Sequence, residues 1–348
     1  MDAVSPSFAA PDVRGLVERA LYPFLEERRR TLPDAEDLLV ELERVARSGG
    51  KRLRPAFCVW GYRAGGGTDD DSIARAAASL ELLHTFAIIH DDVMDRSPFR
   101  RGMPATYRQL ADGGLRGGAD RFGVSAAILA GDLAMALAGE LWWTAGFDGP
   151  ALSDGARIYH AMRAEVIGGQ YLDLLAAARG DATPEETRRI SVLKSGRYTV
   201  ERPLLIGAAL ASARPAVRDA LAAFGAPLGE AFQLHDDIIG AFGDPEVTGK
   251  DADGDLREGK QTLLVALARK GATPEQRATL DELLGADDLT PDGAERVRAI
   301  LRDTGALEEV RDTIASLLAQ ARAVLTAGAI PPEPAAALLS LAADVVPV

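Results

Sequence analysis

The chain has 348 residues, a net charge of −13 at pH 7 and a single cysteine, Cys58. A chain this acidic does not bind nucleic acid through a general basic field, so an anionic ligand would need local basic clusters or bridging cations. One cysteine excludes an internal disulfide framework and favours a cytoplasmic protein. Residues 1–15 lack the pattern of a signal peptide, and Asp132 and Glu140 interrupt the most apolar stretch, so no membrane span is expected.

Helical patterns follow one another along the chain, separated by breaks rich in glycine and aspartate. No alternating strand pattern competes with them, and aromatic residues make up only 5% of the chain. The predicted fold is all-α, with a flexible tail over residues 1–14 and one domain over residues 15–348, although two helical lobes remain possible. The expected helices cover residues 73–95, 125–144, 155–178, 184–211, 215–242 and 262–270. Two amphipathic helices are expected after them, in the C-terminal part of the chain.

The stretch HTFAIIHDDVMD, residues 84–95, ends an apolar helical run in carboxylates. Asp91 and Asp95 are four residues apart, which places them on one helix face at roughly 40°. Carboxylates at this spacing repel each other, so a cation between them would stabilise the pair. Oxygen ligands of this kind suit Mg²⁺, which keeps water and substrate phosphate in its remaining positions. A solvated acidic helix end is the alternative.

A second apolar helical run, residues 230–244, also ends in a carboxylate pair, Asp236 and Asp237. Two such helix ends are hard to explain as two accidental acidic surfaces. Together they predict facing helices that hold metal between them.

Basic residues cluster in two short stretches of this acidic chain. The first is GGKRLRP, residues 49–55, where three basic side chains follow two glycines. Guanidinium and ammonium groups match phosphate oxygens, so this stretch predicts an anion site. Arg100 and Arg101 add a second basic step shortly after the first aspartates. The alternative for either stretch is a basic turn at a helix start.

Single polar residues elsewhere are weaker signals, because each has an ordinary structural role. Gln170 and Asp173 are three apart on a helix, as in a buried hydrogen-bonding pair, and Lys194 could be solvated. Lys250 and Lys260 lie in a glycine-rich loop.

The histidines do not predict a zinc or di-iron centre. His90 and His235 each precede an aspartate pair, but the chain has only one Glu-x-x-His, Glu81 to His84, where a di-iron bundle needs two. Core or supporting histidines are favoured instead.

Taken together, the motifs resemble those of the trans-isoprenyl diphosphate synthases, the polyprenyl synthetase family, and geranylgeranyl diphosphate synthases in particular. The motifs occur in family order from about residue 38 to the C-terminus: GGKRLRP, HDDVMD, RRGMP, GGQYLDL, FQLHDDI, GK and EGKQT. The resemblance implies a helical bundle around a deep apolar cavity, usually in a homodimer. It also implies isopentenyl diphosphate and allylic diphosphates as substrates.

The resemblance implies a role for each motif residue. The Mg²⁺ ligands, for about three ions per active site, would be Asp91 and Asp95 with Asp92 in support, and Asp236 with Asp237 beside it. The allylic diphosphate would be held by Arg100, Lys194 and Lys260, and isopentenyl diphosphate by Lys51, Arg54, His84 and Arg101. Supporting positions would be Gln170, Asp173, Ser195, Gln233 and Lys250.

In such enzymes Mg²⁺ and cationic side chains neutralise a diphosphate leaving group, so that the allylic C–O bond can ionise. The double bond of isopentenyl diphosphate then attacks the carbocation and a proton is lost, with the departing diphosphate as a plausible base. The cavity wall must be apolar and dry, because water would quench the cation.

The chain departs from the family pattern at several positions. Gly240 stands where the fuller pattern has a third aspartate, so metal binding there would rest on Asp236 and Asp237. The other departures are Tyr107 for a common histidine, Ser195 for a usual threonine, and Asp251 and Asp253 for a frequent proline and glycine.

Product length in this family depends on bulk just before the first aspartates. Phe86 is bulky, Ala87 is small, and DDVMD carries no insertion, a combination that resembles synthases making the C20 product. A C15 or longer product is the alternative. A terpene cyclase would not need GGKRLRP for a second diphosphate, and a non-catalytic partner subunit would be expected to lack residues present here.

Overall fold

The computed structural model describes residues 13–111, 118–243, 253–286 and 288–347. The regular secondary structure of these residues is helical apart from one pair of two-residue strands, which confirms the predicted all-α fold. The chain divides into two compact units. The described residues of the first, here the N-terminal unit, lie within 13–153 and 207–213. Those of the second, the C-terminal unit, lie within 154–206 and 214–347.

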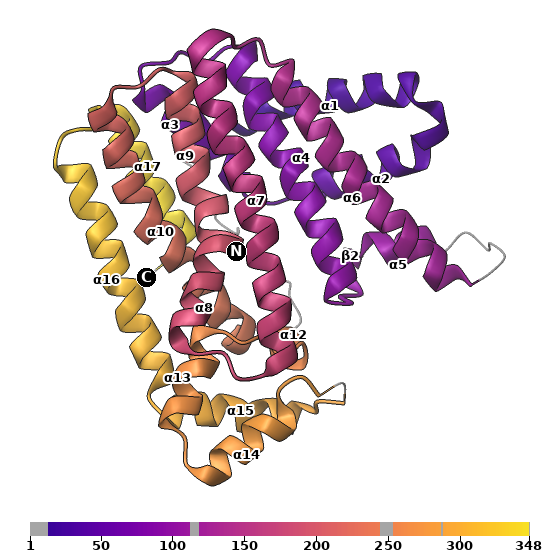
Figure 1. Cartoon of the computed structure of the whole chain (residues 1–348), viewed down its shortest axis with the longest axis vertical. Helices are drawn as coiled ribbons and strands as arrows, with labels where there is room; N and C mark the ends of the chain where they lie inside the picture. The colour runs from indigo at the N-terminus through magenta and orange to yellow at the C-terminus, as the bar shows by residue number, and fades with distance from the viewer. Residues whose placement is uncertain (1–12, 112–117, 244–252, 287, 348) are drawn as a thin grey trace, which may run out of the picture. The chain divides into compact units, whose positions relative to one another are not determined.

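The N-terminal unit is built around one apolar helix, α4 (Asp71–Met94), which packs against α1, α3 and α6 (Figure 1). Most of its residues from Ile73 to Ile89 are buried, in keeping with a helix that is apolar on most sides. Its N-terminus is capped by Asp70, whose carboxylate accepts from the backbone N–H groups of Ser72 and Ile73. The other elements are α1 (Val13–Thr31), η1 (Pro33–Ala35), α2 (Glu36–Arg47), α3 (Leu53–Ala64), β1 (Phe99–Arg100), β2 (Met103–Pro104), α5 (Thr106–Ala111) and α6 (Ala119–Trp143).

The N-terminal helix starts slightly earlier than expected. Val13 and Arg14 lie in α1 rather than in a tail, because Val13 already belongs to the buried face of this helix. The earlier residues of the expected tail lie outside the described part of the chain.

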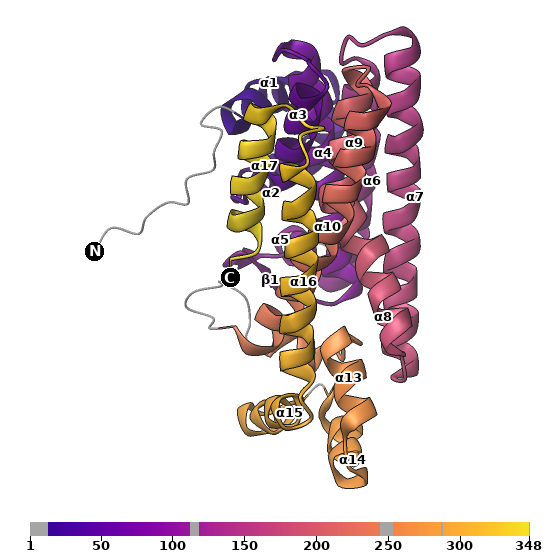
Figure 2. The ribbon, with the colours of Figure 1, turned by 90° about the vertical axis from the view of Figure 1, so that its left-hand side faces the viewer.

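The C-terminal unit is centred on α10 (Pro215–Phe242), which packs against the π-helix η2 (Val192–Glu201) and α16 (Ala306–Thr326). Figure 2 shows α16 beside α17 (Pro332–Val345), its neighbour along the chain. The remaining elements are α7 (Gly149–Arg179), α8 (Pro184–Ser191), α9 (Arg202–Leu210), α12 (Gly254–Arg257), α13 (Leu263–Gly271), α14 (Pro274–Leu283) and α15 (Pro291–Asp303); α7 starts in the N-terminal unit, and α9 ends there.

The predicted helix over residues 184–211 is present but changes character along its length. It starts with a capping box between Thr183 and Glu186. It then widens into η2 before continuing as α9. Pro203 explains the widening, because a proline has no N–H for the helical ladder and its ring crowds the carbonyl one turn earlier.

Two helices, α4 and α6, are long and apolar enough to cross a membrane by length and composition. In the most apolar window of α4, 72% of the residues are buried inside the protein, as in the core helix of a globular unit. The corresponding share in α6 is 44%, so this helix keeps an exposed apolar face.

Candidate active site

The first carboxylate cluster lies at the C-terminal end of α4, where the helix dipole disfavours negative charge. Asp92 is buried, with 2% of its surface exposed. Arg100 Nε donates to Asp92 Oδ1 at 2.7 Å, and Arg100 Nη2 lies 3.3 Å from Asp91 Oδ2. Burial lowers the pKa of Arg100, but the charges of Asp92 and Asp91 outweigh it, and the net shift is upward. A charged guanidinium therefore offsets the buried carboxylates.

A β-hairpin with a two-residue turn gives the neighbouring residues Arg100 and Arg101 different partners. Strands β1 and β2 are antiparallel, and the turn residues Arg101 and Gly102 both have positive φ, 53° and 73°. Arg100 precedes the turn and returns to the aspartates. Arg101 sits in the turn, and its Nη1 lies 2.5 Å from the Gly49 carbonyl and 3.2 Å from Ser48 Oγ. The hairpin thus connects the acidic cluster to the basic loop.

The basic loop brings the predicted isopentenyl diphosphate residues of the N-terminal unit to one region. Lys51 is exposed, and Arg54 is half-buried in the first turn of α3. His84 lies on α4, and its pKa is lowered well below the usual range by burial, then by the charges of Arg54 and Arg101. The imidazole is therefore neutral near pH 7, among cations suited to an anionic ligand.

The second carboxylate cluster lies near the C-terminal end of α10. Asp236 is half-buried, and Asp237 is 7% exposed. Gln233 Nε2 donates to Asp237 Oδ1 at 2.7 Å. Burial raises the pKa of Asp237 to about 7, although the hydrogen bond from Gln233 opposes the shift. A cation would favour the ionised form of this carboxylate.

Asp255, which the sequence analysis missed, joins this second cluster. A Cβ atom on Gly240 would lie 1.8 Å from Asp255 Oδ2, so the carboxylate fills the space that a side chain at position 240 would need. Lys260 Nζ lies 2.6 Å from Asp255 Oδ1 and 3.0 Å from Glu258 Oε2. The glycine that interrupts the motif was the available signal, but only the fold shows which residue uses the space.

Lys194 and Asp173, both weak signals in the sequence, form a partly buried ion pair with Nζ and Oδ2 2.6 Å apart. Lys194 lies in η2 and Asp173 in α7. Gly169 permits their approach, because a Cβ atom there would lie 2.4 Å from the backbone nitrogen of Lys194. Gln170 and Ser195 are half-buried on the same two helices.

Four further predictions concern three side chains on α4 and one loop lysine. Phe86 is buried, and its ring meets the His90 ring edge-to-face with centroids 4.8 Å apart. Ala87 is half-buried. His90 Nε2 lies 3.0 Å from the Ile128 carbonyl, so the imidazole has a hydrogen-bond partner on α6. Lys250 lies outside the described residues.

The carboxylates suit an ion that brings its own ligands. Among the described residues, no three side chains of His, Cys, Asp or Glu converge to form a metal cage. Mg²⁺ does not require such a cage, because it usually takes one or two carboxylates and completes its shell with water and phosphate oxygens. Asp91 and Asp95 in the N-terminal unit, and Asp236 in the C-terminal unit, offer oxygen ligands of this kind.

Comparison with known proteins gives consistent matches. A model of the polyprenyl synthetase family matches residues 36–302. A geranylfarnesyl diphosphate synthase of Aeropyrum pernix is 34% identical over 286 residues, covering 81% of this chain and 85% of the relative. A geranylgeranyl diphosphate synthase of Saccharolobus solfataricus is 33% identical over 258 residues, covering 73% of each chain. A solved geranylgeranyl pyrophosphate synthase from Corynebacterium glutamicum, complexed with isoprenyl diphosphate and magnesium, is 35% identical, with a TM-score of 0.91 over 96% of this chain and 98% of that one.

Asp237→Asn should stabilise the metal-free protein in a pH-dependent way. With a folded pKa of about 7, the buried carboxylate costs stability progressively as the pH rises from about 4 to 7, and fully above 7. Melting in EDTA should show a gain on the order of 5–10 °C at pH 8 that shrinks towards pH 5. Asp219→Asn, exposed on the same helix, is the control. A gain of equal size at both pH values would contradict this origin.

Proposed function

The chain belongs to the polyprenyl synthetase family and is a prenyltransferase; on this premise we propose that it condenses isopentenyl diphosphate with allylic diphosphates to give geranylgeranyl diphosphate. One observation carries the proposal. The hairpin at Arg100 and Arg101 links a carboxylate cluster to a cationic loop. One surface suits a metal-bound diphosphate, and the other suits a diphosphate bound directly by side chains.

The first surface would hold the allylic substrate. Its Mg²⁺ ligands would be Asp91 and Asp95, with Asp92 in support. The C-terminal unit would offer Mg²⁺ ligands of its own, Asp236 with Asp237 beside it. When bound, about three Mg²⁺ ions would supply positive charge that stabilises the departing diphosphate. The Corynebacterium glutamicum relative was solved with isoprenyl diphosphate and magnesium together, which supports this ligand chemistry.

The cations assigned to the allylic diphosphate each have a carboxylate partner in the structure. Arg100 pairs with Asp92, Lys194 with Asp173, and Lys260 with Asp255. These partners orient the cations before substrate binds, which reduces the entropy lost on binding. Gln233 would support the second cluster by keeping Asp237 in place through its hydrogen bond.

The second surface would hold isopentenyl diphosphate through Lys51, Arg54, His84 and Arg101. The neutral imidazole of His84 can donate one hydrogen bond to a phosphate oxygen, while the other residues bring charge. With the diphosphate held there, the double bond can attack the allylic cation as the C–O bond ionises. The proton released in the final step can pass to the departing diphosphate.

Asp255 would supply the carboxylate that Gly240 does not. The side chain enters from α12 rather than from α10, and it occupies the volume next to position 240. Its charge also contributes to the raised pKa of Asp237, as expected for neighbouring carboxylates. Asp255 would therefore support the second cluster from beside it, through its charge and its ion pair with Lys260, and would not complete a three-carboxylate cage.

The C20 product is proposed from Phe86 and Ala87. Relatives at similar identity include a farnesyl, a geranylgeranyl and a geranylfarnesyl diphosphate synthase, whose products differ in chain length. Sequence similarity therefore does not fix the length, and the residues before Asp91 carry the proposal. The buried Phe86 ring packs against His90 and has little freedom to move aside.

The reaction is tested by incubating the purified protein with Mg²⁺, isopentenyl diphosphate and C5, C10 or C15 allylic primers in separate reactions. Chromatography of the dephosphorylated alcohols should give a C20 alcohol from all three. A C15 or C25 product would retain the reaction and overturn the proposed length. Release of a cyclic hydrocarbon without isopentenyl diphosphate would indicate a terpene cyclase, and absence of turnover would indicate a non-catalytic subunit.

Phe86→Ala should lengthen the main product to C25 or beyond, because it removes a large ring from the proposed floor. The measurement is chromatography of the alcohols made from a C15 primer. Phe57→Ala also removes a buried phenyl ring from the same unit, so it controls for the loss of packing. An unchanged product profile for Phe86→Ala would remove this residue from the role.

The protein is melted in the presence of inorganic diphosphate at increasing Mg²⁺ concentrations. Asp255→Asn should raise the Mg²⁺ concentration that gives half of the maximal rise in melting temperature by roughly 10-fold or more. Asp292→Asn, an exposed change in the same unit, should leave it unchanged. Gly240→Asp alone should destabilise the protein through its clash with Asp255, and Asp255→Gly should relieve that clash. An unaltered Mg²⁺ requirement in Asp255→Asn would contradict the assignment.

A second copy of the chain is the proposed partner of α6. The helix exposes Phe122, Ile128, Leu129 and Trp143, of which Leu129 is 58% exposed. Asp132 is exposed on the same helix and would be costly in a lipid core, so a protein surface suits this face better.

We also propose that the enzyme works in the cytoplasm.

Leu129→Glu should convert the homodimer into monomers, because it places a charge in the apolar contact. Sedimentation velocity measures the change, with Leu339→Glu, an exposed leucine on α17, as the control. A dimer that persists in Leu129→Glu would exclude this face as the interface.

A further inference from the structure

The three basic residues of GGKRLRP do not play the same part. Lys51 is exposed and Arg54 is half-buried, but Arg52 between them is only 5% exposed. The backbone of Arg52 is left-handed, with φ of 48°, which an L-residue other than glycine rarely adopts. A conformation of this kind persists only where the surroundings fix the side chain.

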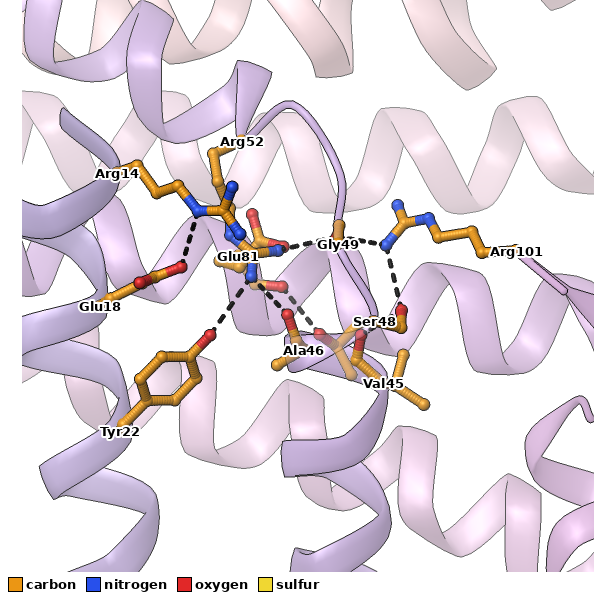
Figure 3. A network of polar contacts seen from close by, with 11 residues as sticks. Arg14, Glu18, Tyr22, Val45, Ala46, Ser48, Gly49, Arg52, Glu81 and Arg101 are labelled. Carbon is orange, nitrogen blue, oxygen red and sulfur yellow. Dashed lines mark hydrogen bonds and ion pairs between the residues drawn. The ribbon is translucent and has the colours of Figure 1, made fainter. Parts of the chain in front are cut away.

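The Arg52 guanidinium is fixed by partners on several elements (Figure 3). Nη1 lies 2.5 Å from Glu81 Oε1, and both side chains are almost fully buried. Nη2 donates to the Ala46 carbonyl at the end of α2 and lies 3.4 Å from the Tyr22 hydroxyl on α1. The side chain therefore ties the loop to the core of the N-terminal unit.

Arg52 and Arg101 meet at one carbonyl of the loop. Arg52 Nη1 lies 3.3 Å from the Gly49 oxygen, and Arg101 Nη1 lies 2.5 Å from the same atom. Figure 3 shows the two guanidinium groups on either side of Gly49. The loop is thus held from the core by Arg52 and from the hairpin by Arg101.

Glu81 places this anchor in register with α4. It lies one helical turn before His84, which belongs to the proposed isopentenyl diphosphate site. Glu81 also offsets the charge of Arg52, which would otherwise add an unpaired buried cation beside Arg54 and Arg101. The pair therefore fixes the loop without itself being available to a ligand.

We propose that Arg52 and Glu81 are positioning residues for isopentenyl diphosphate, which hold Lys51 and Arg54 of the loop in register with His84 on α4. The inference rests on the proposed function and adds two residues to it. Neither residue contacts substrate. Their effect is confined to the loop and its neighbours, so the two diphosphate substrates should respond differently to their removal.

The experiment compares Arg52→Met, the double variant Arg52→Met/Glu81→Met and the control Arg28→Met. Arg28, on α1, is ion-paired with Glu140 on α6 of the same unit. Steady-state kinetics would give KM for each substrate and kcat, and thermal melting would give stability. Arg52→Met should raise KM for isopentenyl diphosphate about 10- to 100-fold. KM for the allylic primer and kcat should stay within about threefold, and the control should change none of them.

The double variant separates positioning from charge balance. Two apolar side chains replace the buried pair, so the melting temperature should recover relative to Arg52→Met. The raised KM should remain, because the hydrogen bonds to Gly49 and Ala46 are still missing. Recovery of both stability and KM would overturn the positioning role, as would an equal rise in KM for both substrates.

A conservative variant covers the case in which Arg52→Met does not fold. Arg52→Lys keeps the charge but loses the planar fork, and should raise KM for isopentenyl diphosphate to an intermediate value with the fold retained. An active wild-type enzyme whose Arg52→Lys variant keeps its KM would overturn this inference alone. A wild-type protein that never consumes isopentenyl diphosphate would overturn the proposed function itself.

Discussion

Negative charge at the C-terminal end of α4 is the constraint on which the candidate site depends. Asp91, Asp92 and Asp95 lie where the helix dipole is unfavourable to carboxylates, and Asp92 is buried as well. Arg100 compensates part of this charge through the hairpin. Under the proposed function, the remaining carboxylate oxygens would bind a divalent cation. An acidic chain can therefore bind an anionic substrate, provided that the cation comes with it.

The hairpin gives the two arginines different partners. Because Arg101 occupies the turn, its guanidinium reaches the basic loop, while Arg100 stays with the aspartates. The buried Arg52–Glu81 pair fixes that loop from the core side. Two regions of opposite charge are thus built from neighbouring segments. Under the proposed function, the acidic region would ionise one diphosphate and the basic region would hold the other intact.

Much of the site could be predicted from sequence, because its signals are local. The aspartates follow apolar helical runs, and the basic loop follows a glycine pair. The remaining features depend on the fold. Arg52 resembles Lys51 and Arg54 in sequence, and only packing turns it inward. Asp255 reaches Gly240 across 15 positions of the chain, and η2 departs from a regular helix ahead of Pro203. The two-residue strands are too short to leave an alternating pattern.

The most direct test of the account is to measure two dissociation constants by calorimetry, one for isopentenyl diphosphate and one for a non-ionising allylic thiodiphosphate. Each is measured once with Mg²⁺ and once with EDTA. The account predicts that removing Mg²⁺ changes the Kd of isopentenyl diphosphate by less than about threefold, since side chains hold it. The Kd of the allylic analogue should rise by a factor on the order of 100 or more, since its diphosphate must meet carboxylates without a bridging ion. Equal loss of both affinities would contradict the division into a cationic and a metal-dependent site.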